Sequence, residues 1–422
     1  MTISVLDYIP AAMHQGIKDG VNTDDLTSYF QLAAQAAFGE LAPEMEMGTL
    51  FVPNGLYHVT SIGIGRIKVV GESTSGTVLK AYSSGAGGEY MLNAKIDVDG
   101  FTTNTSGAGW CESMTLDGAV LGSDSEGSGR SGLQSFAYNN SSSVVLKYLY
   151  CGMNIEMPMW SRIENIYAFR CEIGFLVAAS PDGQSGTSTT FTNCWANESA
   201  SYGFQVGALA YSSFINCVSQ APSGHGGIGF YLLGDWNGPT AANVALQLIG
   251  CGHEGGGLPF YFQRCLELTV IAPRIINPDA DKNLLTFAGS RGTVIDFSSV
   301  AAMTNGAHYV DVVTNDPGHQ PLEPGSIVFV NGNPDWPSGK ETHFTRIGAR
   351  VGSGASPTTS SHEYHVDGKP VVGARRTGWA LPAGPSSKAA FDSASSSLTV
   401  QQLAERLKAL IEDLTAHGLI GA

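Results

Sequence analysis

Four segments of the chain share one pattern and bring aromatic rings, amides and a carboxylate to equivalent positions. They read RIENIYAF, TFTNCWAN, SFINCVSQ and LQLIGCGHE. Alternation along an extended strand places two neighbouring sets of side chains outward. The first set is Tyr167, Trp195, Val218 and Gly252, and the second is Phe169, Asn197, Gln220 and Glu254. Such a ladder suits a sugar chain, because CH groups pack on rings and hydroxyls hydrogen bond to planar polar groups.

Carboxylates near this ladder could act on a glycosidic bond. Hydrolysis usually needs one carboxylic acid and one carboxylate about 5 to 9.5 Å apart. Because neighbouring strands lie about 4.8 Å apart, acids on the same or the next coil meet this requirement. Glu254 is the first candidate, since it ends a strand and Gly252 leaves space beside it, and Asp235 follows because Trp236 could stack on a sugar. The predicted catalytic residues are Glu254, Asp235, Glu198 and His253, and the predicted substrate-binding residues are Tyr167, Trp195, Asn197, Gln220 and Trp236.

Two other interpretations of these residues stay open. Each acid taken alone is more commonly a solvated surface group, and each ring or amide a packing residue. His253 or His225 could instead be the base of a polysaccharide lyase, which also needs a cation to stabilise the enolate. The repeats offer few cations, namely Lys147, Arg162, Arg170 and Arg264. No CxxC or HExxH spacing predicts a metal site, and we expect no cofactor.

The four segments are predicted to be successive coils of a solenoid. One column contains only residues that enter the left-handed backbone region at low cost, namely Asn165, Asn193, Asn216 and Gly250. The next column is Ile166, Cys194, Cys217 and Cys251, and it is expected to point inward. A second register, Ile155, Phe175, Phe204, Phe230 and Phe260, predicts an aromatic stack inside. The fold class predicted is all-β, a right-handed parallel β-helix from about residue 40 to 330 whose length differences lie in outer loops.

Composition excludes several classes of protein. Of 422 residues only 14% are charged and 53 are Gly, which favours a turn-rich β architecture. The net charge of −15, without a block of Lys or Arg, argues against nucleic acid as a partner. No apolar run approaches 18 residues and the first ten residues lack the pattern of a secretory signal, so we expect neither a membrane span nor Sec export. The seven cysteines are expected to be reduced core residues.

The N-terminal region carries a family resemblance. The stretch NTDDLTSYFQLAAQAAF predicts a helix over 24–38 with Asn22 or Thr23 as its cap, and GTLFVPNGLYHVTSI predicts the first strands. This order resembles the start of the pectate-lyase-like β-helix superfamily, and VLDYIPAAMHQGIKDG resembles phage tailspikes in particular. The residues that match are Asp7, Tyr8, Asp19, Gly20, Asp24, Asp25, Gly48, Val52, Pro53, Gly55, Tyr57, Gly71 and Thr77. Where many members have Gly-Ala after the tyrosine, this chain has Ile9 and Pro10.

The C-terminal region is predicted to contain a short coiled-coil helix. Its seam follows 3-4-3-4 spacing through Val400, Leu403, Leu407, Leu410 and Leu414. The stretch VVGARRTGWALPAGPSSKAAFD before it resembles the C-terminal ends of phage structural proteins. The predicted parts are an N-terminal strand and capping helix (1–40), the β-helix (41–300), a terminal β region (301–352), a linker-like region (353–397) and the trimerisation helix (398–422).

Together the resemblances imply a phage tailspike that binds and cleaves a bacterial surface polysaccharide, such as capsule, exopolysaccharide or O-antigen, by glycoside hydrolysis. They imply a homotrimer in the virion that contacts other phage tail proteins. The alternatives are a polysaccharide lyase with the same fold, a receptor-binding fibre without catalysis, and a purely structural virion component. The ladder of Tyr167, Trp195 and Asn197 argues against the last of these.

Overall fold

The computed structural model describes most of the first 296 residues and shorter stretches after them. The described residues are 2–39, 48–85, 89–94, 109–119, 129–180, 183–221, 227–234, 243–276, 283–288, 290, 292–296, 310–312, 327–330, 344–347, 364–366, 369–372, 385 and 399–416. Two compact units divide the chain, Met1–Val351 and Gly352–Ala422. Each is described below by itself.

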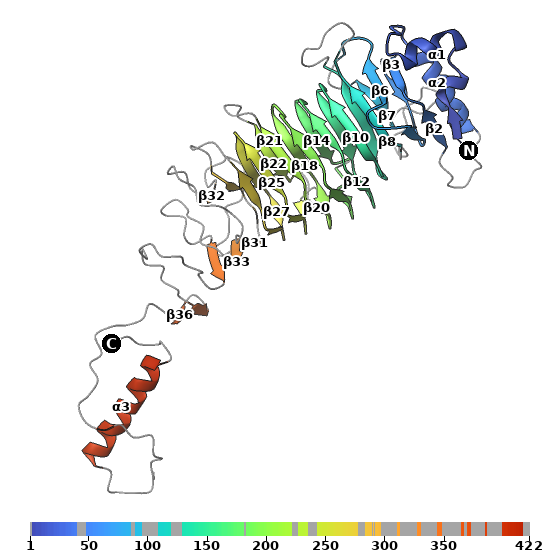
Figure 1. Ribbon diagram of the computed structural model, residues 1–422. Coiled ribbons are helices and arrows are strands. Elements are labelled where there is room, and N and C mark those ends of the chain that lie inside the picture. Colours follow the sequence, from blue (N-terminus) through green and yellow to red (C-terminus); the bar gives the residue numbers. More distant parts are fainter. Residues whose placement is uncertain are drawn as a thin grey trace. The chain divides into compact units, whose positions relative to one another are not determined.

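The first unit is a right-handed parallel β-helix, as the sequence predicts. Figure 1 shows its strands side by side from the blue to the yellow part of the chain. Each complete coil passes through four faces in chain order, which we number 1 to 4. A 20-stranded parallel sheet folds into faces 1 and 2, a 10-stranded sheet forms face 3, and a 4-stranded sheet forms face 4.

The strands of each face are short and repeat from coil to coil. Face 1 contains β1 (Thr2–Ser4), β2 (Thr49–Val52), β5 (Lys68–Gly71), β12 (Arg162–Glu164), β16 (Thr190–Thr192), β20 (Ser213–Ile215), β24 (Gln247–Ile249), β28 (Thr269–Ile271), β31 (Thr293–Asp296), β33 (Ile327–Val330) and β34 (Phe344–Ile347). Face 2 contains β3 (Gly55–Val59), β6 (Thr77–Ala81), β13 (Tyr167–Phe169), β17 (Trp195–Asn197), β21 (Val218–Ala221), β25 (Gly252–Gly255) and β29 (Arg274–Ile276). Strands β8 (Trp110–Asp117) and β10 (Ser142–Lys147) run through both faces.

Faces 3 and 4 complete each coil. Face 3 contains β4 (Ile62–Gly63), β7 (Tyr90–Asn93), β9 (Ser131–Phe136), β11 (Cys151–Glu156), β14 (Ile173–Ala178), β18 (Tyr202–Gly207), β22 (Ile228–Leu233), β26 (Leu258–Gln263), β30 (Leu285–Ala288) and β32 (Val310–Val312). Face 4 contains β15 (Gly186–Thr187), β19 (Leu209–Ala210), β23 (Asn243–Val244) and β27 (Cys265–Leu266). Strands β32, β33 and β34 fall within the predicted terminal β region, and all three pair in parallel with strands of the solenoid.

Single residues in the left-handed conformation turn the chain between faces 1 and 2. The predicted column Asn165, Asn193, Asn216 and Gly250 has φ of 54°, 52°, 52° and 62°. A side chain amide or a missing Cβ lowers the cost of this conformation, so these residue types recur there. The stacked turn expected from the sequence is confirmed.

The interior is packed by residues stacked in register. Phe175, Phe204, Phe230 and Phe260 form parallel ring stacks with centroid distances of 4.7, 4.6 and 5.0 Å. The thiols of Cys194, Cys217 and Cys251 are buried in the neighbouring column, and all seven cysteines are free. Burial raises the pKa of Cys111, Cys171 and Cys265 to about 12, so these thiols stay protonated.

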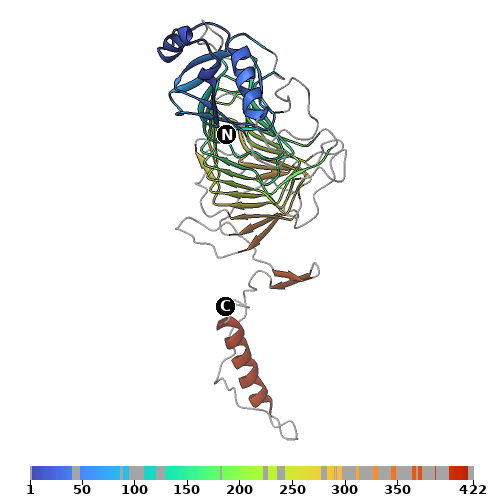
Figure 2. The same cartoon turned by 90° about the vertical axis from the view of Figure 1, so that its right-hand side faces the viewer.

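Two helices lie at the N-terminal end of the solenoid, where the sequence predicts one (Figure 2). Helix α2 (Thr27–Gly39) corresponds to the predicted helix, and α1 (Ala11–Lys18) follows a short 3-10 turn, η1 (Val5–Asp7). The helix cap differs from the prediction. Neither Asn22 nor Thr23 caps α2, because the carboxylate of Asp25 accepts a hydrogen bond from the backbone N–H of Thr27 at 3.0 Å.

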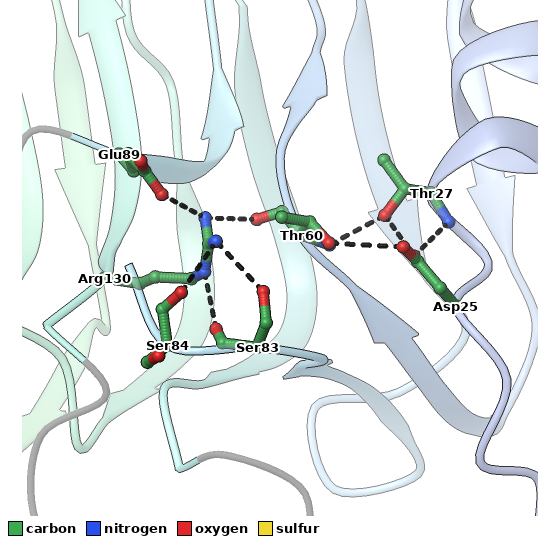
Figure 3. Close-up of polar contacts among 7 residues, drawn as sticks. All are labelled: Asp25, Thr27, Thr60, Ser83, Ser84, Glu89 and Arg130. Atoms are coloured by element: carbon green, nitrogen blue, oxygen red, sulfur yellow. Dashed lines mark hydrogen bonds and ion pairs between the residues drawn. The ribbon is translucent and has the colours of Figure 1, made fainter. Parts of the chain in front are cut away.

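A chain of polar contacts ties α2 to the first coils (Figure 3). The hydroxyl of Thr27 accepts a hydrogen bond from the backbone N–H of Thr60 at 2.7 Å. The carbonyl of Thr60 in turn accepts one from the buried guanidinium of Arg130 at 3.2 Å. Arg130 also donates to the carbonyl of Ser83 and forms an ion pair with Glu89 at 3.0 Å. One arginine therefore joins three segments of chain to the capping helix.

The second unit contains a hairpin and a helix among its described residues. Strands β35 (Tyr364–Val366) and β36 (Lys369–Val372) pair antiparallel within the predicted linker-like region, and α3 (Val400–Ala416) lies within the predicted trimerisation helix. In the described part of the chain, no helix is long and apolar enough to span a bilayer.

Candidate functional site

The predicted ladder lies on face 2 in the expected register. Tyr167 pairs with Trp195, Trp195 with Val218, and Val218 with Gly252. In the second column Asn197 pairs with Gln220, and Gln220 with Glu254. Each step is one parallel strand, about 4.8 Å along the solenoid. The structure therefore brings together the residues that sequence alignment assigns to one outer face.

The aromatic end of the ladder is held in a defined geometry. Trp195 is 40% exposed, and its ring packs nearly perpendicular to the Tyr167 ring at a centroid distance of 5.6 Å. The amide of Asn197 donates to the Tyr167 hydroxyl at 2.6 Å, while its carbonyl oxygen is buried. Asn197 is thus engaged in orienting Tyr167, so we assign it to the positioning of the ring.

Glu254 lies at the other end of the same face. Its side chain is half-buried on β25 beside Gln220, and it makes no hydrogen bond or ion pair with any residue that the structure describes. On the next coil Arg274 pairs with Gly252 and Ile276 pairs with Glu254. Arg274, which is exposed, and Glu254 are therefore diagonal neighbours on adjacent strands of face 2. Diagonal neighbours are about 7 to 8 Å apart, a separation that long side chains can span.

Two expectations about this end of the ladder need correction. Gly252 does not leave an open space, because it is buried and a Cβ there would meet the carbonyl oxygen of Arg274 at 2.9 Å. His253 points into the solenoid, where it is fully buried and its Nε2 lies 2.8 Å from the carbonyl of Gly256. A side chain at that position does not reach a ligand on the outer face, since alternation turns it away from Glu254.

Glu198 occupies the corner that follows Asn197. Its φ is 54°, and its carboxylate forms an ion pair with Arg170 at 2.6 Å. The Arg170 guanidinium also lies over the ring of Phe169 at 5.1 Å. Glu198 is two coils from Glu254, about 9.6 Å along the axis alone, which already reaches the upper limit of about 9.5 Å for a pair of hydrolytic carboxylates.

Three predicted residues fall outside the described part of the chain, namely Asp235, Trp236 and His225. Among the residues that are described, no three His, Cys, Asp or Glu side chains gather as a metal site would require. We therefore assign no metal ligand.

Sequence reasoning missed Arg274. The alignment does continue for one more coil, because in TVIAPRII Ala272 takes the corner position and Pro273 takes the place of the column of cysteines. The next residue, Arg274, then belongs to the column of Trp195 and Gly252. Replacement of the Asn-Cys or Gly-Cys pair by Ala-Pro conceals this coil when only residue identity is compared.

No protein-family model matches the sequence, and a search of curated proteins found no match. Among solved structures, the chain is similar to ORF18 of Geobacillus virus E2, with 17% identity and a TM-score of 0.46 over 82% of this chain and 60% of that one. It is also similar to tailspike protein 3 of bacteriophage CBA120 (12%, 0.44, 78% and 48%) and to DFA-IIIase from Arthrobacter chlorophenolicus A6 (11%, 0.48, 83% and 99%). The chain thus spans less than two thirds of the length of both viral proteins. Because their TM-scores are below 0.5, these similarities carry no argument about substrate or mechanism, and both are argued from the residues of this chain.

Proposed function

We propose that this chain is a phage tail protein that binds a bacterial surface polysaccharide along face 2 and cleaves it by hydrolysis. The observation that carries the proposal is the outward ladder from Tyr167 and Trp195 to Gln220 and Glu254, in a register of one coil per step. The sequence resemblance of the N- and C-terminal regions to phage structural proteins supports the virion setting and contact with other tail proteins.

The roles follow from chemistry and position. Trp195 offers an exposed ring face on which CH groups of a sugar can pack, and Tyr167 supports it. Gln220 offers both donors and acceptors to sugar hydroxyls. Glu254 has no protein partner among the described residues, so its carboxyl group is free to give a proton to the leaving glycosidic oxygen or to take one from water. The second carboxyl group that hydrolysis needs is Glu198 or, on sequence grounds, Asp235.

Elimination by a lyase is the second candidate, and Arg274 favours it. A lyase must stabilise the enolate that forms when a proton leaves the carbon next to a uronate carboxylate, and a guanidinium can do this. Arg274 is exposed and lies diagonally across from Glu254, which would then act as the base. No water is consumed in this reaction, and the new chain end carries a double bond.

The test uses Glu254→Gln and the release of reducing ends from capsular and lipopolysaccharide preparations. We expect turnover to fall at least about a hundredfold while binding of the polysaccharide is retained, the usual scale for an essential acid or base. Trp195→Ala should weaken binding instead. Glu164→Gln is the matched control, since this acid lies on face 1 in an ion pair with Arg162. Full activity of Glu254→Gln on a substrate that the unaltered protein cleaves would overturn the assignment.

Absorbance of an unsaturated uronate, recorded in the same assay, separates the two reactions. Hydrolysis predicts new reducing ends without this absorbance, whereas elimination predicts both. If elimination occurs, Arg274→Ala should abolish it. Binding without either product would identify a receptor-binding fibre, and no binding at all would contradict the proposed function.

A further inference from the structure

A second strip of exposed aromatic residues runs along the corner between faces 4 and 1. Tyr138 stacks on Trp160 at 5.7 Å with an interplanar angle of 23°. Two coils beyond Trp160 lies Tyr211, with Ser188 at the same corner between them. Trp160 and Tyr211 are 62% and 70% exposed. We name Tyr138, Trp160, Ser188 and Tyr211 the 4–1 strip.

Backbone hydrogen bonds fix the spacing of the strip. The N–H of Trp160 donates to the carbonyl of Thr187 and that of Ser188 to the carbonyl of Ala210, at 3.1 Å each. Corner residues of successive coils are therefore stacked, about 4.8 Å apart. The backbones of Trp160 and Tyr211 are therefore about 9.6 Å apart along the solenoid axis.

The backbone at this corner disfavours large side chains. Trp160 and Tyr211 both have φ of 47°, a left-handed conformation that is an outlier for a bulky residue. The same corner holds Ser188 and Ala245 in other coils. Positive φ is common at the coil corners of this solenoid, where Tyr148 and Glu198 also have it. What sets these two positions apart is the largely exposed ring that each carries.

Hydroxyl and amide groups run beside the rings. The neighbouring outward column on face 1 contains Thr190, Ser213 and Gln247 in adjacent strands. The Ser213 hydroxyl donates to Gln247 Oε1 at 3.4 Å. Exposed rings next to hydroxyls and an amide match a sugar chain, as argued for face 2. The cation in this column, Arg162, is already paired with Glu164 at 2.6 Å, so the charge of the strip does not favour an acidic polymer.

From this geometry we propose that the 4–1 strip is a second carbohydrate-binding site, which takes a neutral polysaccharide segment lying parallel to the solenoid axis. It lies across face 1 from the ladder and holds the polymer without cleaving it. Its occupant is a glycan and not a second copy of the chain, because the strip is one residue wide with polar neighbours. A stable protein interface needs roughly 800 Å² on each partner, which a strip one residue wide does not supply.

The test is affinity electrophoresis of the full chain through gels that contain dextran, pullulan or galactomannan, with alginate as the acidic comparison. The variant is Trp160→Asn with Tyr211→Asn, because asparagine already occupies left-handed corners at Asn165, Asn193 and Asn216. We expect at least one neutral polymer to retard the unaltered protein, and the variant to bind that polymer about tenfold more weakly, the scale of two lost ring contacts. Its melting temperature should not fall, since the strained rings are removed.

Two comparisons keep this inference separate from the function proposed for face 2. The asparagine variant should cleave short oligosaccharides at an unchanged rate, whereas Trp195→Ala should keep its retardation by the neutral polymer. Retardation of neither the unaltered protein nor the variant, or equal retardation of both, would refute the second site. A change of oligomeric mass in the variant, measured by light scattering, would show instead that the strip is an interface between copies.

Discussion

The neighbours His253 and Glu254 on β25 have opposite surroundings, because His253 packs against face 3 across the interior whereas Glu254 lies on the outer side. His253 points inward and fills space that glycine leaves on face 3, since a Cβ at Gly229 would meet His253 Nδ1 at 2.4 Å. The same pairing recurs in earlier coils, where a Cβ at Gly203 would meet the Ser219 hydroxyl at 2.2 Å. Inward residues of face 2 and glycines of face 3 therefore share one layer. His253 acts there as a packing residue.

This pairing predicts that Gly229→Ala destabilises the protein. The added methyl group must displace His253 or the carbonyl of Pro259, which it would meet at 2.6 Å, and overpacking of this kind costs about 1 to 3 kcal/mol. Chemical denaturation of the two proteins measures the cost. Gly207→Ala is the matched control, because its new Cβ meets nothing closer than 3.5 Å. Combining Gly229→Ala with His253→Ala should recover part of the loss, and strict additivity would disprove the coupling.

His58 predicts how stability depends on pH. It is buried on β3, and burial lowers its pKa, with Lys80 adding to the effect and Asn22 and Asp117 opposing it. The unfolded chain then binds a proton more readily, so the stability due to neutral His58 is complete above its ordinary pKa of about 6.5 and declines as the pH falls below it. Between pH 7.5 and 5, the melting temperature of the His58→Leu variant should fall less than that of the unaltered protein. An equal loss in both would exclude His58 as the source.

At the scale of elements, the sequence predicts those parts that repeat. The columns of Asn193, Cys194 and Trp195 are readable because each coil imposes the same corner, inward and outward positions. Helix α1 escaped prediction since its segment contains Gly16 and begins without a side-chain cap. Asp25 replaces the expected caps because its carboxylate also faces Thr60, a contact 35 residues away that no local pattern contains.

Among the candidate site residues too, those at repeated positions of the coils are the ones that the sequence predicts. The positions of Trp195, Gln220 and Glu254 could be predicted because they belong to repeated columns. The ion pair of Glu198 with Arg170 joins two corners of different coils, so it needs the three-dimensional register. Asp235 and Trp236 belong to no column, and alignment of the coils therefore assigns them no place on a face.

Because Arg130 links the first coils to the capping helix α2, we expect its replacement to destabilise this end of the solenoid. Arg130 is 3% exposed, and its guanidinium contacts Thr60, Ser83 and Glu89 at once. Arg130→Met removes a buried charged donor and leaves the partly buried carbonyl groups of Thr60 and Ser83 without it, which we expect to cost about 2 to 4 kcal/mol. Amide hydrogen exchange should accelerate in α2 and β3 before other strands. Arg162→Met, at an exposed ion pair, should change stability by less than about 1 kcal/mol. Equal effects of the two substitutions would contradict the role given to Arg130.

At the scale of the whole molecule, α3 presents a row of exposed apolar side chains. Val400, Leu403, Leu407 and Leu410 are all more than half exposed. The helix nonetheless begins with a reciprocal cap, in which Gln402 N–H donates to the Thr399 hydroxyl at 3.2 Å and Thr399 N–H donates to Gln402 Oε1 at 3.1 Å. A helix with a capped N-terminus and solvent-exposed leucines is typical of one helix of a coiled coil that forms with other copies of the chain.

We therefore predict a homotrimer held partly by this seam. Light scattering should give three times the chain mass of 44.2 kDa, and a single chain mass would refute the prediction. Two heptads are too short to hold chains together alone, so Leu403→Glu with Leu407→Glu should slow assembly more than it loosens trimers already formed. Gln401→Glu, on an exposed position of the same helix, is the control for added charge. Unchanged assembly kinetics in the leucine variant, with trimers still formed, would place the association in the β-helix instead.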